Sequence, residues 1–309
     1  MPSLKTLTFA KKLLFAPIFL FSFAFLLFQL KANLGSYGII FSVSIDTFKS
    51  LLIFSSLICL SSFLFCIFAG LAEDLKIVLP INLLASILPP LIIEPSVGLI
   101  LSLITFIILT VTFLTLSRKL KSYINFEPNS LFGPSIRSLV GLLILVFSIG
   151  YFMSINKVIA EDGFVIPESL IDSAMKFVPT DSESDNSSSS LPSPSSEQLA
   201  ILKQNPDLLK QSGLDPKILD SLSPGKSAKT TTQDIVKQTL QAQVQTMIKP
   251  YINFIPAILT VLFFIILQSL TSLIGLLIYP LLWLTFYILE KTGYIKFTEE
   301  QRTVRKMII

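Results

Sequence analysis

Long runs of apolar residues alternate with short polar connections along the first half of the chain. Five of these runs approach the ~20 apolar residues that a helix needs to cross a bilayer. They are residues 13–30, 51–71, 77–93, 97–116 and 139–155. The runs are apolar on every side and do not alternate over ~10 residues as the strands of a membrane barrel do. The pattern therefore predicts five transmembrane helices within residues 1–155.

A second uncharged region lies near the end of the chain. Residues 251–289 contain no charged residue, and this is about twice the length that one crossing needs. We predict two spans here, 252–270 and 273–289, folded as a hairpin whose turn lies near Gln268 and Gly275. Together with the first five, they predict an all-α polytopic membrane protein with about seven transmembrane helices.

Two shorter segments need separate treatment. Residues 37–48 are apolar but short and carry Asp46, so we predict an interfacial or re-entrant segment. The first apolar run follows several lysines, as in a signal peptide. It is long for the apolar core of such a peptide, and the residues around Lys31 are a poor cleavage site. We therefore predict an uncleaved first span.

The pattern becomes polar between the two membrane regions. Residues 156–180 are predicted to form a short amphipathic helical segment. The Ser-rich stretch 181–196 cannot bury enough apolar surface to offset its chain entropy, which predicts a disordered linker. Residues 197–250 are predicted to form short helices and then an amphipathic helix leading into the membrane. The hairpin over 251–290 and a basic tail over 291–309 complete the chain.

Basic residues in short connections predict how the protein sits in the membrane. The loop at 117–138 is one such connection, and its basic residues are Arg118, Lys119, Lys121 and Arg137. The positive-inside rule places this loop and the N-terminus in the cytoplasm and exports the insert 156–250. The basic tail conflicts with this, because two spans after the insert return it to the insert's side. We expect a plasma-membrane protein with a cytoplasmic N-terminus, since the first helix usually dominates; one miscounted span would also remove the conflict.

Composition restricts the chemistry further. Hydrophobic residues make up 52% of the 309 residues and charged residues 14%, against roughly 25% charged in soluble domains. The net charge of +4 is spread over loops and tails, which disfavours nucleic-acid binding. Histidine is absent, so the commonest general base and metal ligand is missing. We predict no catalytic, cofactor or metal site, and a protein that is not an enzyme.

One apolar run contains a ridge of small residues. Ser55, Cys59, Ser62, Cys66 and Gly70 recur at spacings of three and four and share one helical face. Small residues let helices approach closely in lipid, where no hydrophobic force drives association. The ridge predicts a helix-packing face; a pore-lining or thiol-reactive role is the alternative.

Three polar residues within or beside the apolar runs are weaker candidates for a site. Asn82 lies near Pro80, a combination that could break the helix and expose carbonyl groups. Glu94 and Gln268 lie at predicted span ends, where water is near, and are predicted to be simple turn residues. A functional role stays open for Asn82, because polar groups at membrane depth often mark functional sites.

These observations leave three hypotheses for function. The first is a non-enzymatic membrane protein that presents a tethered helical insert to a partner protein or envelope component, or that self-associates through its amphipathic helices. The second is a transporter or channel component. The third, a membrane-embedded enzyme, has the least support because the sequence offers carboxylates and lysines alone.

Overall fold

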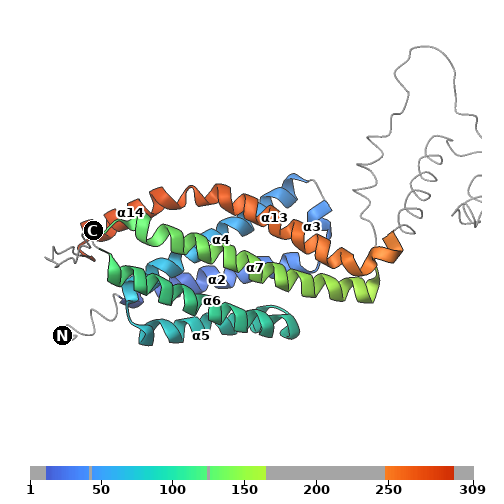
Figure 1. Cartoon of the computed structure of the whole chain (residues 1–309), viewed down its shortest axis with the longest axis horizontal. Coiled ribbons are helices and arrows are strands. Elements are labelled where there is room, and N and C mark those ends of the chain that lie inside the picture. Colours follow the sequence, from blue (N-terminus) through green and yellow to red (C-terminus); the bar gives the residue numbers. More distant parts are fainter. Residues whose placement is uncertain (1–11, 42–43, 124–125, 165–247, 296–309) are drawn as a thin grey trace, which may run out of the picture. The chain divides into compact units, whose positions relative to one another are not determined.

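The computed structural model describes four stretches of the chain, residues 12–41, 44–123, 126–164 and 248–295. Within them the secondary structure is helical, without strands (Figure 1). The predicted Ser-rich linker, the amphipathic segments of the insert and almost all of the basic tail lie outside these stretches.

The described residues confirm an all-α polytopic membrane protein. Six helices are long and apolar enough to cross a bilayer, and a shorter seventh helix follows them. The long helices are α2 (Phe15–Leu34), α4 (Ile45–Ala72), α5 (Leu75–Ile92), α6 (Pro95–Ser122), α7 (Pro128–Asp162) and α13 (Ile255–Gly275), the last preceded by a 3₁₀ turn, η1 (Lys249–Phe254). The seventh is α14 (Ile278–Lys291).

Short connections between α4, α5 and α6 are specified by their capping residues. Glu73 takes a left-handed conformation with φ of 57° and ends α4. The Asp74 carboxylate then accepts a hydrogen bond of 3.0 Å from the amide of Lys76 and caps α5. At the next connection, a Cβ on Gly98 would lie 2.6 Å from Pro90 Cα, so only glycine allows α5 and α6 to meet this closely.

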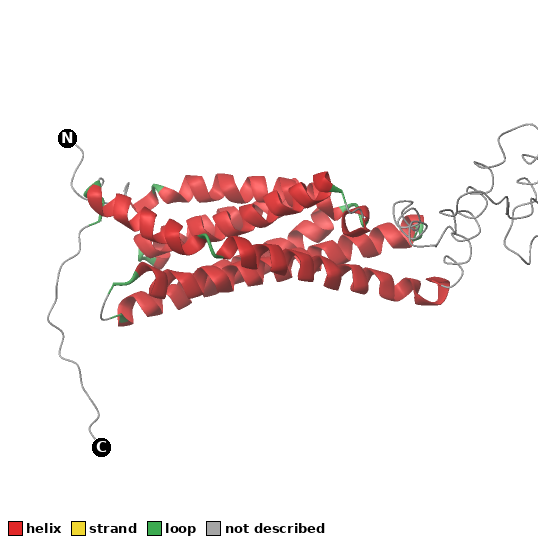
Figure 2. Cartoon of the chain, turned by 90° about the horizontal axis from the view of Figure 1, so that it is seen from above, coloured by secondary structure: helices red, strands yellow, loops and turns green. Residues whose placement is uncertain are grey.

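Aromatic rings and small hydroxyls hold the first helices against α4. The Phe19 and Phe65 rings lie 5.2 Å apart, and the Ser22 and Ser61 hydroxyls are 2.9 Å apart. On another side of α4, the Phe54 ring lies 5.9 Å from that of Phe147 in α7. These contacts place α4 inside the bundle, whose helices lie side by side (Figure 2).

The last two helices differ from the predicted hairpin, because both run in one direction alongside α7. Tyr151 stacks on Phe263 at 4.4 Å, Arg137 lies over Tyr279, and Phe132 contacts Phe286 at 5.1 Å. As the α7 residue number falls, the partner number rises steadily through the end of α13. Such a series requires α14 to continue α13 antiparallel to α7 (Figure 1). α13 and α14 therefore run in one direction along α7 and do not fold back on each other as the predicted hairpin would.

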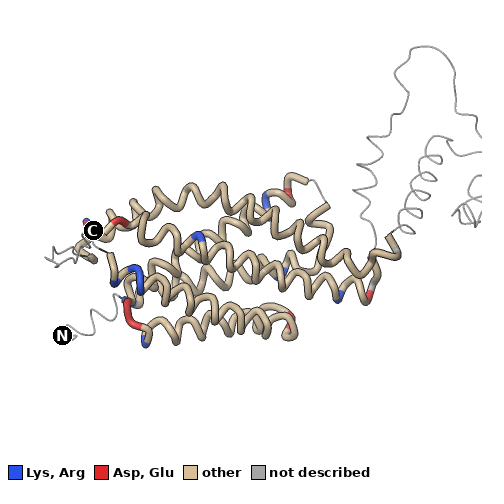
Figure 3. The backbone as a smooth tube through the Cα atoms, in the orientation of Figure 1, with Lys and Arg blue, Asp and Glu red and all other residues tan. Residues whose placement is uncertain are grey.

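One end of the bundle gathers several helix ends and many basic residues. Lys12 lies 3.5 Å from Glu73 at the end of α4. A Cβ on Gly70 would meet the rings of Phe132 in α7, at 2.5 Å, and the side chain of Leu120 in α6. We call this the basic end, after Lys12, Arg118, Lys119, Lys121 and Lys291. Charged residues lie mainly at the two ends of the helices (Figure 3).

The chain divides into two compact units. The bundle described above belongs to the first, and the second is formed by residues 37–43 and 156–259. In the second unit the rings of Tyr37 and Phe164 lie 5.4 Å apart. The single turn α3 (Gly38–Phe41) is too short to span a membrane. Asp46, predicted in the same interfacial segment, instead belongs to the first turn of α4, which the Ser44 hydroxyl caps.

Candidate functional site

The break between α13 and α14 opens one wall of a cavity. Gly275 ends α13, and the amides of Leu276 and Leu277 bond to carbonyls only three residues back, at 3.2 and 2.9 Å. Such bonds tighten the last turn of a helix. Pro280 has no amide proton to give to the carbonyl of Leu276, so α14 starts as a separate helix. The sequence itself thus specifies this break.

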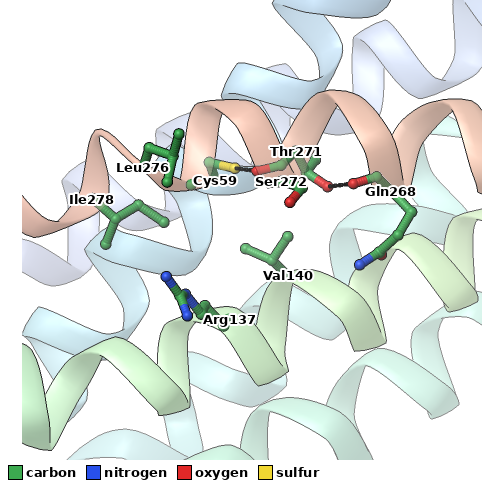
Figure 4. A pocket seen from close by; sticks show the side chains of 9 residues that line it. Cys59, Arg137, Val140, Gln268, Thr271, Ser272, Leu276 and Ile278 are labelled. Atoms are coloured by element: carbon green, nitrogen blue, oxygen red, sulfur yellow. Dashed lines mark hydrogen bonds between the residues drawn. The ribbon is translucent and has the colours of Figure 1, made fainter.

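A cavity of about 240 Å³ lies between α7 and the α13–α14 strip, with α4 behind it (Figure 4). We call it the Arg137 cavity. Its lining includes both polar and apolar side chains, and Arg137 is the charged residue among them. Its lining residues are Cys59, Arg137, Val140, Gln268, Thr271, Ser272, Gly275, Leu276 and Ile278.

Arg137 is the residue that the sequence interpretation missed as a site residue. It was predicted in a loop, but α7 begins at Pro128, which places Arg137 ~14 Å along the helix. Its guanidinium carbon lies 4.8 Å from the centre of the Tyr279 ring, a cation–π contact. Among the described residues, no ion pair joins Arg137 to a carboxylate.

The sequence did contain a signal for the early start of α7. Pro128 suits the first position of a helix. An apolar stripe at helical spacing extends from the predicted span back towards it, and every member of this stripe is buried: Leu131, Phe132, Ile136, Leu139 and Val140.

Hydrogen bonds fix the wall of the cavity opposite Arg137. The Thr271 hydroxyl donates to the carbonyl of Leu267 at 2.8 Å and contacts that of Gln268 at 3.2 Å. The Cys59 thiol lies 3.9 Å from the carbonyl of Thr271 and links α4 to α13. Thr271 is 3% exposed, whereas Gln268 and Ser272 are exposed and direct their side chains towards the cavity (Figure 4).

The structure brings two predicted site residues together here. Gln268 was predicted at a turn, but it lies inside α13, two turns before the break. Cys59 comes from the predicted small-residue ridge. The other ridge residues stay away from the cavity: Ser55, Ser62 and Cys66 are buried in α4, and Gly70 lies against Phe132.

Asn82 lies apart from this cavity and in an unbroken helix. It is 0% exposed, and its amide nitrogen donates to the Thr110 hydroxyl of α6 at 3.3 Å. The prediction that Pro80 and Asn82 could break the helix was wrong, because α5 is continuous through both. Pro80 removes the donor for a single carbonyl, that of Lys76 near the helix start.

Glu94 also lies apart, in the connection that the sequence predicted. It occupies the N-cap position of α6, and its carbonyl accepts a bond of 2.7 Å from the amide of Gly98. No group of three or more His, Cys, Asp or Glu residues able to hold a metal occurs in the described stretches. The chemistry that the described site offers is therefore hydrogen-bond donation around one cation.

Comparison with known proteins finds no matching family, no similar characterised protein and no similar solved structure.

Proposed function

We propose that this multi-pass membrane protein is a non-enzymatic anchor that holds the insert at one membrane face for contact with a partner. The observation that carries the proposal is the way the insert is attached. Residues 165–247 join α7 to α13, two helices that contact each other through the stacked rings of Tyr151 and Phe263. The insert is thus tethered at both ends to neighbouring helices.

The filling of the bundle interior supports an anchor more than a conduit. The rings of Phe54, Phe147, Phe263 and Tyr151 are 0–1% exposed and touch one another between α4, α7 and α13. Aromatic side chains packed in this way fill the space among these helices with largely apolar surface. A transporter or channel component is therefore the less supported candidate.

The single crossing of α13 and α14 also supports the proposed orientation. It returns the end of α14 to the basic end, where α2 begins and α6 ends. The conflict between the basic tail and the other basic segments disappears. The positive-inside rule then favours a cytoplasmic basic end and an extracytoplasmic insert in the plasma membrane.

Site-specific photocrosslinking in living cells tests the proposal. A photoreactive residue at Leu208 or Ile235 in the insert should give discrete protein adducts. The same residue at Leu103, a 64% exposed position on α6, serves as the lipid-facing control and should give none. Two differently tagged copies of the chain would identify adducts that come from self-association. Equal yields from insert and control positions would contradict the proposal.

A further inference from the structure

The Arg137 cavity holds a positive charge on a membrane-spanning helix, and no carboxylate of the described stretches pairs with it. We propose that it binds a single phosphate group, and that the lateral position of the cavity favours the headgroup of an anionic phospholipid as its source. A charged side chain inside a span is costly, and such residues usually pair with another group. Within the described stretches no ion pair supplies that group for Arg137.

The geometry of the guanidinium suits a phosphate. The guanidinium carbon of Arg137 lies 4.8 Å from the centre of the Tyr279 ring, and a cation–π contact of this kind does not use the guanidinium N–H groups as hydrogen-bond donors. This planar fork matches phosphate oxygens in a bidentate way that lysine cannot reproduce. Ser272 and Gln268 add a hydroxyl and an amide from α13 on the opposite wall (Figure 4). The cavity therefore offers hydrogen-bond donors from two helices.

The surroundings of the cavity favour a lipid over a soluble anion. Arg137, Gln268 and Ser272 are exposed on the flank of the bundle. Beside them, Leu273, Leu276 and Leu277 are 66%, 64% and 67% exposed and offer an apolar surface for acyl chains. The cavity also lies on the half of α7 nearest the basic end, whose lysines and arginines attract anionic lipids.

Gly275 provides a way to fill the cavity without removing the charge. It lines the cavity and is buried, yet a Cβ built on it has no atom within 4 Å. A leucine at this position would therefore extend into open space. Gly141, on α7, also has nothing within 4 Å of a Cβ but does not line the cavity. It offers a matched control.

Trp283 supplies a local reporter. It is the only tryptophan of the chain, it is 61% exposed, and it lies one turn beyond Tyr279 in α14. The full chain would be reconstituted into phosphatidylcholine nanodiscs that contain brominated phosphatidylglycerol or brominated phosphatidylcholine. Quenching of Trp283 then measures how strongly each lipid associates beside the cavity.

The wild-type protein should favour phosphatidylglycerol by roughly fivefold, the effect of about one basic residue near an anionic lipid. Arg137→Gln and Gly275→Leu should each reduce the preference to about one, and Arg137→Lys to an intermediate value because it keeps the charge but loses the fork. Gly141→Leu, on α7 but outside the cavity lining, should leave the preference unchanged. Thermal unfolding of each variant reports whether it still folds.

Inorganic phosphate distinguishes a lipid headgroup from free phosphate in solution as the occupant of the cavity. Quenching is measured with added phosphate and, in a parallel sample, with sodium chloride at the same ionic strength. Quenching that is insensitive to phosphate supports the lipid headgroup. A preference that phosphate abolishes and chloride does not supports a phosphate site filled from solution. A wild-type protein without preference, or a preference that a folded Arg137→Gln or Gly275→Leu variant retains, overturns the proposal. If Arg137→Gln does not fold, Gly275→Leu decides the outcome.

Discussion

Helices α4 and α13 are both long and strongly apolar, yet they occupy opposite environments. α4 buries 72% of its most apolar stretch inside the bundle, whereas α13 buries 22%. Hydrophobicity brings both helices into the membrane but does not decide which of them other helices surround. In lipid that choice depends on how closely neighbouring backbones can approach.

The two helices differ in where their small residues lie. α4 carries serine and cysteine side chains that are at most 4% exposed: Ser55, Cys59, Ser61, Ser62 and Cys66. α13 instead has one narrow buried stripe with a residue every fourth position, at Leu259, Phe263, Leu267 and Thr271. A central helix thus needs small residues on several sides, and a peripheral helix needs only one packed face.

The common direction of α13 and α14 along α7 predicts that they cross the membrane once, and a labelling experiment gives an all-or-none test. Cysteine would be placed at Ser122, Tyr251 or Thr292, all exposed, in a chain that carries Cys59→Ser and Cys66→Ser. One crossing places Ser122→Cys and Thr292→Cys on the same side of the membrane and Tyr251→Cys on the other. An impermeant maleimide should label only Tyr251→Cys in intact cells.

A hairpin would give a different pattern in the same experiment. Thr292→Cys would then react together with Tyr251→Cys and separately from Ser122→Cys. Labelling of all three positions after permeabilisation controls for reactivity. If Tyr251→Cys and Thr292→Cys share a side, the broken crossing is wrong.

Two serines provide a matched comparison of the buried and the peripheral helix. Ser62 in α4 and Ser269 in α13 each donate to the carbonyl four residues back at 2.8 Å. Ser62 is 0% exposed and Ser269 is exposed. Ser62→Leu should lower the free energy of unfolding by about 1–3 kcal/mol through overpacking, and Ser269→Leu by no more than about 0.5 kcal/mol.

The measurement is unfolding by denaturing detergent, followed by the fluorescence of Trp283. Because both substitutions remove the same local hydrogen bond, the difference between them reports packing alone. Equal losses of stability would contradict the different environments of α4 and α13.

The sequence predicted the helices well because the length and apolarity of a run are local properties. It failed where tertiary packing decides. An uncharged run of the length of 251–289 fits two crossings of ~30 Å, and no local residue excludes them. In the structure, α13 and α14 together lie along α7, because the 35 residues of α7 extend over ~53 Å. Arg137 was missed as a site residue for a similar reason, since Tyr279 and most of the cavity lining come from parts of the chain far from it in sequence.

The smallest changes in unfolding free energy are expected when a polar residue buried in the bundle is compared with a polar residue exposed on its flank. Asn82 is buried and bonded to Thr110, whereas Gln268 is exposed and lines the Arg137 cavity. Asn82→Leu should cost about 0.6 kcal/mol of unfolding free energy, the typical value of a hydrogen bond between membrane helices. Gln268→Leu should cost less, because the Gln268 side chain is exposed and makes no hydrogen bond to another helix in the described stretches, yet it should weaken the phosphatidylglycerol preference.

The same two variants would also show whether Asn82, and not Gln268, belongs to the lipid site. The Asn82→Leu variant should keep the lipid preference of the wild type, because Asn82 does not line the cavity. A preference lost on Asn82→Leu and kept on Gln268→Leu would move the site from the flank of α7 to the α5–α6 pair. Stability and lipid preference measured on the same nanodisc samples separate a packing residue from a binding residue, which neither measurement does alone.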